Sequence, residues 1–150
     1  MPFTQNQNVT FVYQPQAALG AIINANGTSP IAIYTGGANG SKVAGSIIAS
    51  STDTASRDVL VGVNVGGSAT LGSAITGGTS ITFGAVAVPA GAGQSGAVPP
   101  VNLMPTIMPI DSDGEQYLFL PAAAFLFLQM VVAIASGKQL SYYVPAIGDF

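Results

Sequence analysis

The chain has 150 residues, of which only 6% are charged, and three Lys or Arg against six Asp or Glu leave a net charge of −3 at pH 7. A typical soluble domain carries about 25% charged residues. Three cations exclude nucleic-acid binding as a main role, because that affinity comes chiefly from Lys and Arg that displace counterions. Cys and His are both absent, which excludes a disulfide framework, a thiolate metal site and a Ser-His-Asp catalytic triad.

A chain of this length fits one domain with a sizeable core, and we expect a single domain over 1–150. So little charge implies a surface of Ser, Thr, Asn and Gln, a surface covered by partners, or both. The first residues, Met-Pro-Phe-Thr-Gln-Asn-Gln, have neither the basic region nor the apolar core of a signal peptide. We therefore expect the protein to be made and used without export.

The N-terminal third has the pattern of an arm followed by short strands. Residues 1–8 are polar with few apolar anchors, which predicts an extended arm. Alternation and β-branched residues predict strands at 9–13, 21–24, 31–34 and 43–49. Asn26-Gly27 and Asn39-Gly40 supply the positive φ angles that tight hairpin turns require.

The middle of the chain shows the clearest alternation. One face of a predicted strand consists of Val59, Val61, Val63 and Val65, and the other of Asp58, Leu60, Gly62 and Asn64. Further strands are predicted at 69–75 and 81–88, between turns at Gly66-Gly67 and Gly77-Gly78. Gly84 shifts the apolar phase of the later strand, which predicts a β-bulge.

Residues 91–109 are rich in Gly, Ala and Pro and lack apolar periodicity. We expect 91–100 to be a loop and the segment that follows to be extended, since proline cannot donate to a central ladder. The prolines that space this strap are Pro99, Pro100, Pro105 and Pro109.

The segment 117–135 contains no charged residue and is long enough for a membrane-spanning helix. The preferred interpretation is a β-hairpin or strand pair at 117–120 and 125–134, joined around 121–124, because Pro121 would kink a helix and Phe, Val and Ile suit pleated sheets. Both faces of 125–134 are apolar, so this strand is central in a core or half in a subunit interface. A last strand at 140–144 follows the Gly137-Lys138 turn.

Three polar clusters are candidate sites. Asp111, Asp113 and Glu115 surround an Asp-Gly turn and are weak candidates for a calcium site. They fall short of the ligand pattern of a calcium loop, so we prefer a solvated hairpin turn and expect no metal. The run Gly36–Lys42 approaches a phosphate-binding loop, but Ser41 precedes Lys42, in the wrong order.

Asp53, Arg57 and Asp58 form the third cluster. Arg57 could bind a carboxylate within the chain or across an interface, and a local surface ion pair is preferred. A Ser–Lys pair would have to use Lys42 or Lys138, both in predicted turns. We therefore predict no catalytic residue, no cofactor and no enzymatic activity.

The runs Tyr34–Lys42, Ser51–Arg57 and Asp111–Pro121 resemble the small head decoration, or cement, proteins of tailed double-stranded DNA bacteriophages. The resemblance extends over about 34 to 144 and consists of turns and strand edges. It implies a β-sandwich or jelly roll, an oligomer at symmetry points of the shell, and no chemistry. The two basic positions that match it are Lys42 and Arg57.

These observations together predict an all-β protein: a single antiparallel β-sandwich, jelly-roll-like, with about eight strands. The expected role is to bridge subunits of the major capsid protein on the outer surface of a virion, as a homo-oligomer that we expect to be a trimer, after synthesis in the bacterial cytoplasm. Alternatives are a tail, collar or fibre-base component and a small protein inserted in a membrane through 117–135. The candidate interface residues are Phe125, Phe127, Leu128, Met130, Pro99, Pro100, Pro105, Pro109 and Arg57.

Overall fold

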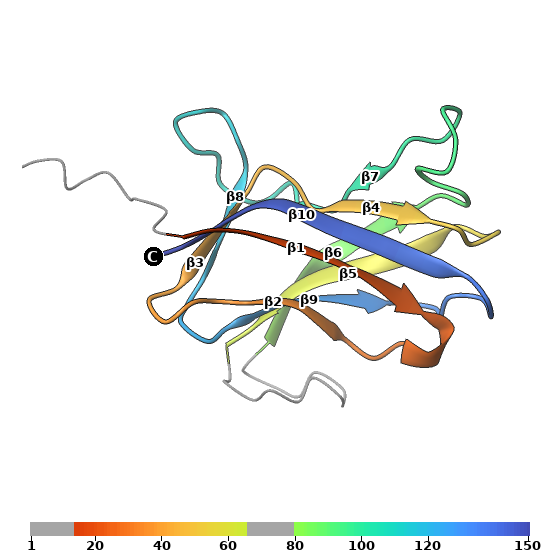
Figure 1. Ribbon diagram of the computed structural model, residues 1–150, viewed down its shortest axis with the longest axis horizontal. Coiled ribbons are helices and arrows are strands. Elements are labelled where there is room, and N and C mark those ends of the chain that lie inside the picture. The colour runs from red at the N-terminus through yellow and green to blue at the C-terminus, as the bar shows by residue number, and fades with distance from the viewer. Residues whose placement is uncertain (1–13, 66–79) are drawn as a thin grey trace, which may run out of the picture.

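A computed structural model describes residues 14–65 and 80–150, and it places them in two antiparallel β-sheets packed face to face (Figure 1). In these ranges there is no α-helix, only a short 3-10 helix, η2 (Asn24–Asn26). The strands are β1 (Gln14–Ile23), β2 (Ile31–Thr35), β3 (Ser41–Ala44), β4 (Ile48–Ser51), β5 (Arg57–Asn64), β6 (Ser80–Val88), β7 (Val101–Asn102), β8 (Tyr117–Leu120), β9 (Phe125–Met130) and β10 (Gln139–Asp149). The predicted all-β sandwich is confirmed.

The first sheet is organised around β10. Along one edge β10 pairs with β1, and along its other edge it pairs with β4 near its start and with β3 near its end. The far edges of β4 and β3 pair with β7 and β8. The second sheet has the order β2-β9-β5-β6. Most connections cross from one sheet to the other, so strands distant in sequence become neighbours.

The single strand predicted at 43–49 is wrong, because the chain forms two strands there. Gly45 has a φ of 77°, and β3 and β4 on either side of it both lie along β10 with registers that differ by one residue. A local break of this kind lets one segment follow the twist of the long strand β10.

The core lies between the two sheets and follows the predicted alternation. Val59, Val61 and Val63 are buried, although Val65, beyond the end of β5, is 55% exposed. The bulge predicted at Gly84 is confirmed. Gly84 has a φ of 109°, and the register of β6 against β5 shifts at this point.

The apolar segment 117–135 forms two strands rather than a helix, as predicted, but the two strands do not pair with each other as a hairpin. β8 pairs with β3 in the first sheet, whereas β9 lies between β2 and β5 in the second. Residues 121–124 therefore carry the chain across the sandwich, and β9 ends at Met130 rather than at 134. No helix in the described ranges is long and apolar enough to cross a membrane.

The glycines predicted to form turns lie in the connections between strands. Gly27, Gly40, Gly114 and Gly137 all have positive φ, yet at Gly27, Gly40 and Gly137 the chain passes between sheets instead of closing a hairpin. The arm at 1–8, the strands at 9–13 and 69–75, and the turns at 66–67 and 77–78 lie outside the described residues.

Candidate functional site

The acidic turn at 111–115 is organised by Asp111. Its Oδ1 accepts hydrogen bonds from the backbone N–H groups of Asp113 and Glu115, both at 3.0 Å, and its Oδ2 accepts one from Lys42 Nζ at 2.9 Å. The Lys42 hydrogen bond is the main reason that the pKa of Asp111 is lowered. Lys42 also lies 4.9 Å from the centre of the Tyr117 ring. The turn predicted by sequence is therefore tied to β3 by an ion pair that sequence did not indicate.

This turn borders an open groove of about 400 Å³, whose other side is formed by Pro15 and by the segment 145–148. Asp113 and Glu115 are exposed at its rim. Within the described part of the chain, no three His, Cys, Asp or Glu side chains lie close enough together to hold a metal ion.

The glycine-rich run Gly36–Lys42 is a crossing between sheets in which the N–H groups of all three glycines are already hydrogen-bonded. Gly36 N–H donates to Ala124 O, Gly37 N–H to Ser41 Oγ and Gly40 N–H to Gly37 O, at 2.8 to 3.0 Å. A phosphate-binding loop needs such N–H groups free to point at the anion. The arrangement therefore does not suit phosphate.

Ser41, which is buried, belongs to a hydrogen-bonded group with the half-buried Tyr34 and Asp149. The Oδ1 atom of Asp149 accepts hydrogen bonds from Ser41 Oγ at 2.5 Å and from Tyr34 Oη at 2.7 Å. Burial, and then the hydrogen bond to Asp149, raise the pKa of Tyr34 to about 12. These contacts join β2, β3 and β10, and they hold the end of β10 against the crossing between β2 and β3.

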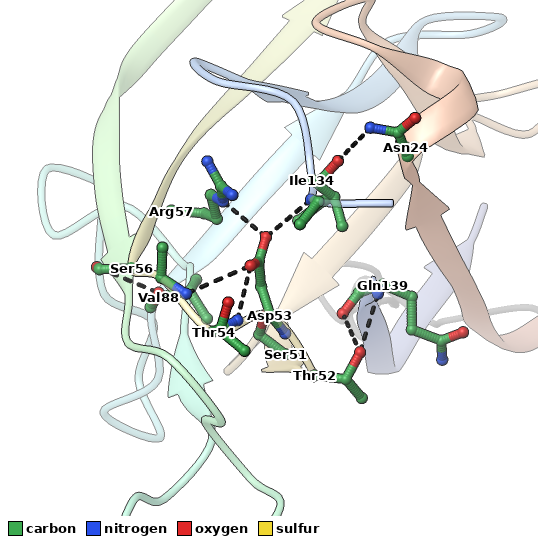
Figure 2. A network of polar contacts seen from close by, with 12 residues as sticks. Asn24, Ser51, Thr52, Asp53, Thr54, Ser56, Arg57, Val88, Ile134 and Gln139 are labelled. Atoms are coloured by element: carbon green, nitrogen blue, oxygen red, sulfur yellow. Dashed lines mark hydrogen bonds and ion pairs between the residues drawn. The ribbon is translucent and has the colours of Figure 1, made fainter. Parts of the chain in front are cut away.

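The third cluster is a buried ion pair, not the surface pair that the sequence led us to prefer (Figure 2). Arg57 Nε donates to Asp53 Oδ2 at 2.7 Å, and only 1% of the Asp53 side chain and 15% of the Arg57 side chain are exposed. Sequence indicated the pair but not its burial. Asp58, the neighbouring acid, is exposed.

Asp53 connects three loops at one end of the sandwich. Its Oδ2 accepts a second bond from Ala135 N–H at 3.0 Å, and its Oδ1 accepts bonds from Thr54 and Ala55 N–H at 2.7 and 3.3 Å. Its backbone O accepts a bond from Gly91 N–H at 3.1 Å. The Arg57 bond is the main reason that the pKa of Asp53 is held far below its usual range. A carboxylate held in this way is a structural anchor.

Most of the predicted interface residues of β9 lie inside the protein. Leu128 and Met130 are buried in the core between the sheets. Phe127 is also fully buried, and its ring lies where a side chain on Gly62 would be, 2.4 Å from that ideal Cβ position. Phe125 is half-buried. The two-faced apolar pattern of this strand therefore reflects a central position in its sheet.

The strap is fixed in its middle and exposed on either side. Leu103 and Met104 belong to the core and Pro105 is buried, whereas Pro99, Pro100 and Pro109 are exposed. Next to this anchor, Ile107 and Ile110 are 71% and 65% exposed. The expectation that this segment is extended is wrong beyond β7, because the chain turns at 106–107, where Met108 N–H donates to Pro105 O at 3.1 Å. Sequence indicated neither the anchor nor the exposed isoleucines, because no periodicity marks an irregular segment.

Comparisons with family models, with curated proteins and with solved structures found no match to this chain.

Proposed function

We propose that this chain is a non-enzymatic structural protein of a virion, which binds the major capsid protein of a tailed phage on the outside of the shell and stabilises it by bridging subunits. The observation that carries the proposal is the strap, with Leu103 and Met104 in the core and Ile107 and Ile110 exposed beside them. Exposed apolar side chains that gather on one surface mark protein interaction sites, and these two isoleucines lie three residues apart in the sequence.

The strand order supports a jelly roll, which we propose as the finer description of the fold. If β3 and β4 are counted together as one strand, and β7 and β8 as another, the two sheets contain eight strands. The first of these strands, β1, pairs with the last, β10. Jelly rolls are built in this way from two Greek keys and occur in viral capsid proteins, but also in lectins and cupins. The fold is therefore compatible with the proposed role, but it does not distinguish this role from the other functions of jelly rolls.

The stabilising mechanism is mass action. A protein that binds the assembled shell and not its free subunits shifts the equilibrium toward the shell. With three cations in the whole chain, attachment rests on apolar contacts and on backbone hydrogen bonds of the strap. We expect binding to depend little on salt, because screening acts mainly on exposed charges.

The test is occupancy of undecorated heads of the phage that encodes the chain, measured by co-sedimentation for wild type and for the double variant I107S/I110S. The matched control is I81S, which makes the same change at an isoleucine of β6 that is 58% exposed. We expect the double variant to lose occupancy while its melting temperature and that of I81S stay near wild type. A polar linker in place of 99–109 is unsuitable, because it would remove Leu103 and Met104 from the core.

The proposal fails if wild type does not bind heads, or if the double variant binds as well as wild type. A collapse of occupancy between low and moderate salt would show that attachment is electrostatic. Binding to purified tails instead of heads would assign the chain to the tail, collar or fibre base.

A further inference from the structure

The free edge of β1 is less protected against pairing with another chain than the other sheet edges of the described structure. At the opposite edge of its sheet lie β7 and β8, with two and four residues. In the second sheet, β2 has five residues and a register shift, and β6 is bulged at Gly84. Short strands, bulges and charges are the devices that keep sheet edges from pairing with other chains.

β1 has few of these protections. It has ten residues, and its one register shift lies between Gln16 and Ala18, so that 18–23 pairs regularly with β10. No other strand of the described ranges pairs with its outer edge. The strand carries no charge, and the first charged residue of the whole sequence is Lys42. At the end of the strand the Ile23 N–H donates to Asn26 Oδ1 at 2.7 Å, and the rest of the edge offers backbone groups that no described strand pairs and no charge protects.

The side chains of β1 alternate between the face that packs on the core and the outer face of the sheet. Ala18 and Ile22 are buried in the core, and Gly20 lies under the ring of Tyr142. On the outer face, Leu19 is 77% exposed, Ile23 is 45% exposed, and Ala21 between them is exposed. Leu19 continues into an apolar row with Tyr143 of β10 and Ile48 of β4, its successive cross-strand neighbours.

We propose that β1 pairs antiparallel with β1 of a second copy of this chain about a two-fold axis at Ala21, which joins two sheets into one. In this register Leu19 lies opposite Ile23 of the second copy, and Ala21 lies opposite its own equivalent. On the inner face the bulky Ile22 lies opposite Gly20, which has no side chain. The pattern is thus complementary to itself, and no like charges oppose each other.

We identify the partner of β1 as a second copy of this chain, because a two-fold contact uses the same surface on both chains and the sequence of β1 is complementary to itself. An unrelated strand would lack this match of large residues with small ones in both directions. The pairing closes with two copies and gives a dimer rather than the trimer that the family resemblance implies. It does not depend on the capsid role, so failure of either proposal leaves the other standing.

The register is read by cysteine cross-linking in the full chain, which has no native Cys. Directly opposed residues have Cα atoms about 4.5 to 5.5 Å apart, within disulfide range. A21C should therefore form a covalent dimer under mild oxidation. L19C or I23C alone should not, because equivalent residues would be about 13 Å apart along the strands, but an equimolar mixture of L19C and I23C should cross-link.

The control is A97C, at an exposed residue of the loop between β6 and β7. Equal cross-linking of A97C and A21C, or no cross-linking of A21C, would overturn the proposal. Cross-linking of L19C with itself would show a different register and would also overturn it.

Sedimentation tests the same contact without covalent chemistry. Wild type at micromolar concentration should be a dimer, and A21K or A21E should raise the dissociation constant about fivefold, since like charges would oppose each other at the axis. Mixing A21K with A21E should restore the dimer. Ala21 is exposed, so the variants should still fold, and their melting temperature should recover together with the dimer on mixing. A monomeric wild type, a trimer, or variants that do not recover on mixing would refute the pairing.

Discussion

Asp53 gives the sharpest test of what holds one end of this sandwich together. In D53N one oxygen still accepts the N–H groups of Thr54 and Ala55, but the new amide donor faces the N–H groups of Arg57 and Ala135, which need an acceptor. The substitution also leaves Arg57 as a largely buried cation without its carboxylate.

Removal of one partner from a buried ion pair costs about 3 to 5 kcal/mol. We expect this range for D53N, a large share of the roughly 5 to 15 kcal/mol that stabilises a typical domain. The measurement is denaturant unfolding, in which the midpoint should fall while the slope stays the same. D58N is the matched control, because it removes the same charge from the next acid along the chain, which is exposed, and surface substitutions usually stay within about 0.5 kcal/mol.

The same network predicts how stability depends on pH. The pKa of Asp53 is lower in the folded state than in the unfolded state, so the folded protein keeps the carboxylate charged at pH values where the unfolded chain binds a proton. The stabilisation is complete above the unfolded pKa of about 3.9 and is lost progressively as the pH falls below it. The difference between wild type and D53N should therefore shrink on acidification. A loss in D53N no larger than in D58N, or a difference that does not change down to pH 2, would refute the reasoning.

Three further predictions address other parts of the structure. G62A should destabilise the protein by about 1 to 3 kcal/mol, because the new Cβ would lie 2.4 Å from Phe127 Cζ and 2.5 Å from a backbone oxygen, whereas G96A, in open space, should stay near wild type in denaturant unfolding. Because the pKa of Tyr34 is raised from 10.0 to about 12, the stabilisation from its neutral phenol should be lost between these pH values, and alkaline melting curves of Y34F should lack that loss. Addition of a chelator should leave the melting temperature unchanged; a large drop would revive the calcium interpretation of the turn at 111–115.

The sequence by itself determined the all-β class, the buried face of β5, and the bulge at Gly84. Each of these rests on a local property: side chains alternate between faces with a period of two, and glycine tolerates positive φ. The residues next to Val61 in the sequence contain this information. The positions of the turn glycines were predictable for the same reason.

Only the tertiary structure decided which strands pair. The hairpin expected at 117–134 does not form, because β8 and β9 find their partners in different sheets, and the strand expected at 43–49 breaks at Gly45 to follow β10. The burial of the Asp53–Arg57 pair likewise depends on loops up to 82 residues away in sequence, as the bond to Ala135 shows. Pairing and burial depend on contacts between distant segments, and a local pattern of apolar residues is compatible with many such arrangements.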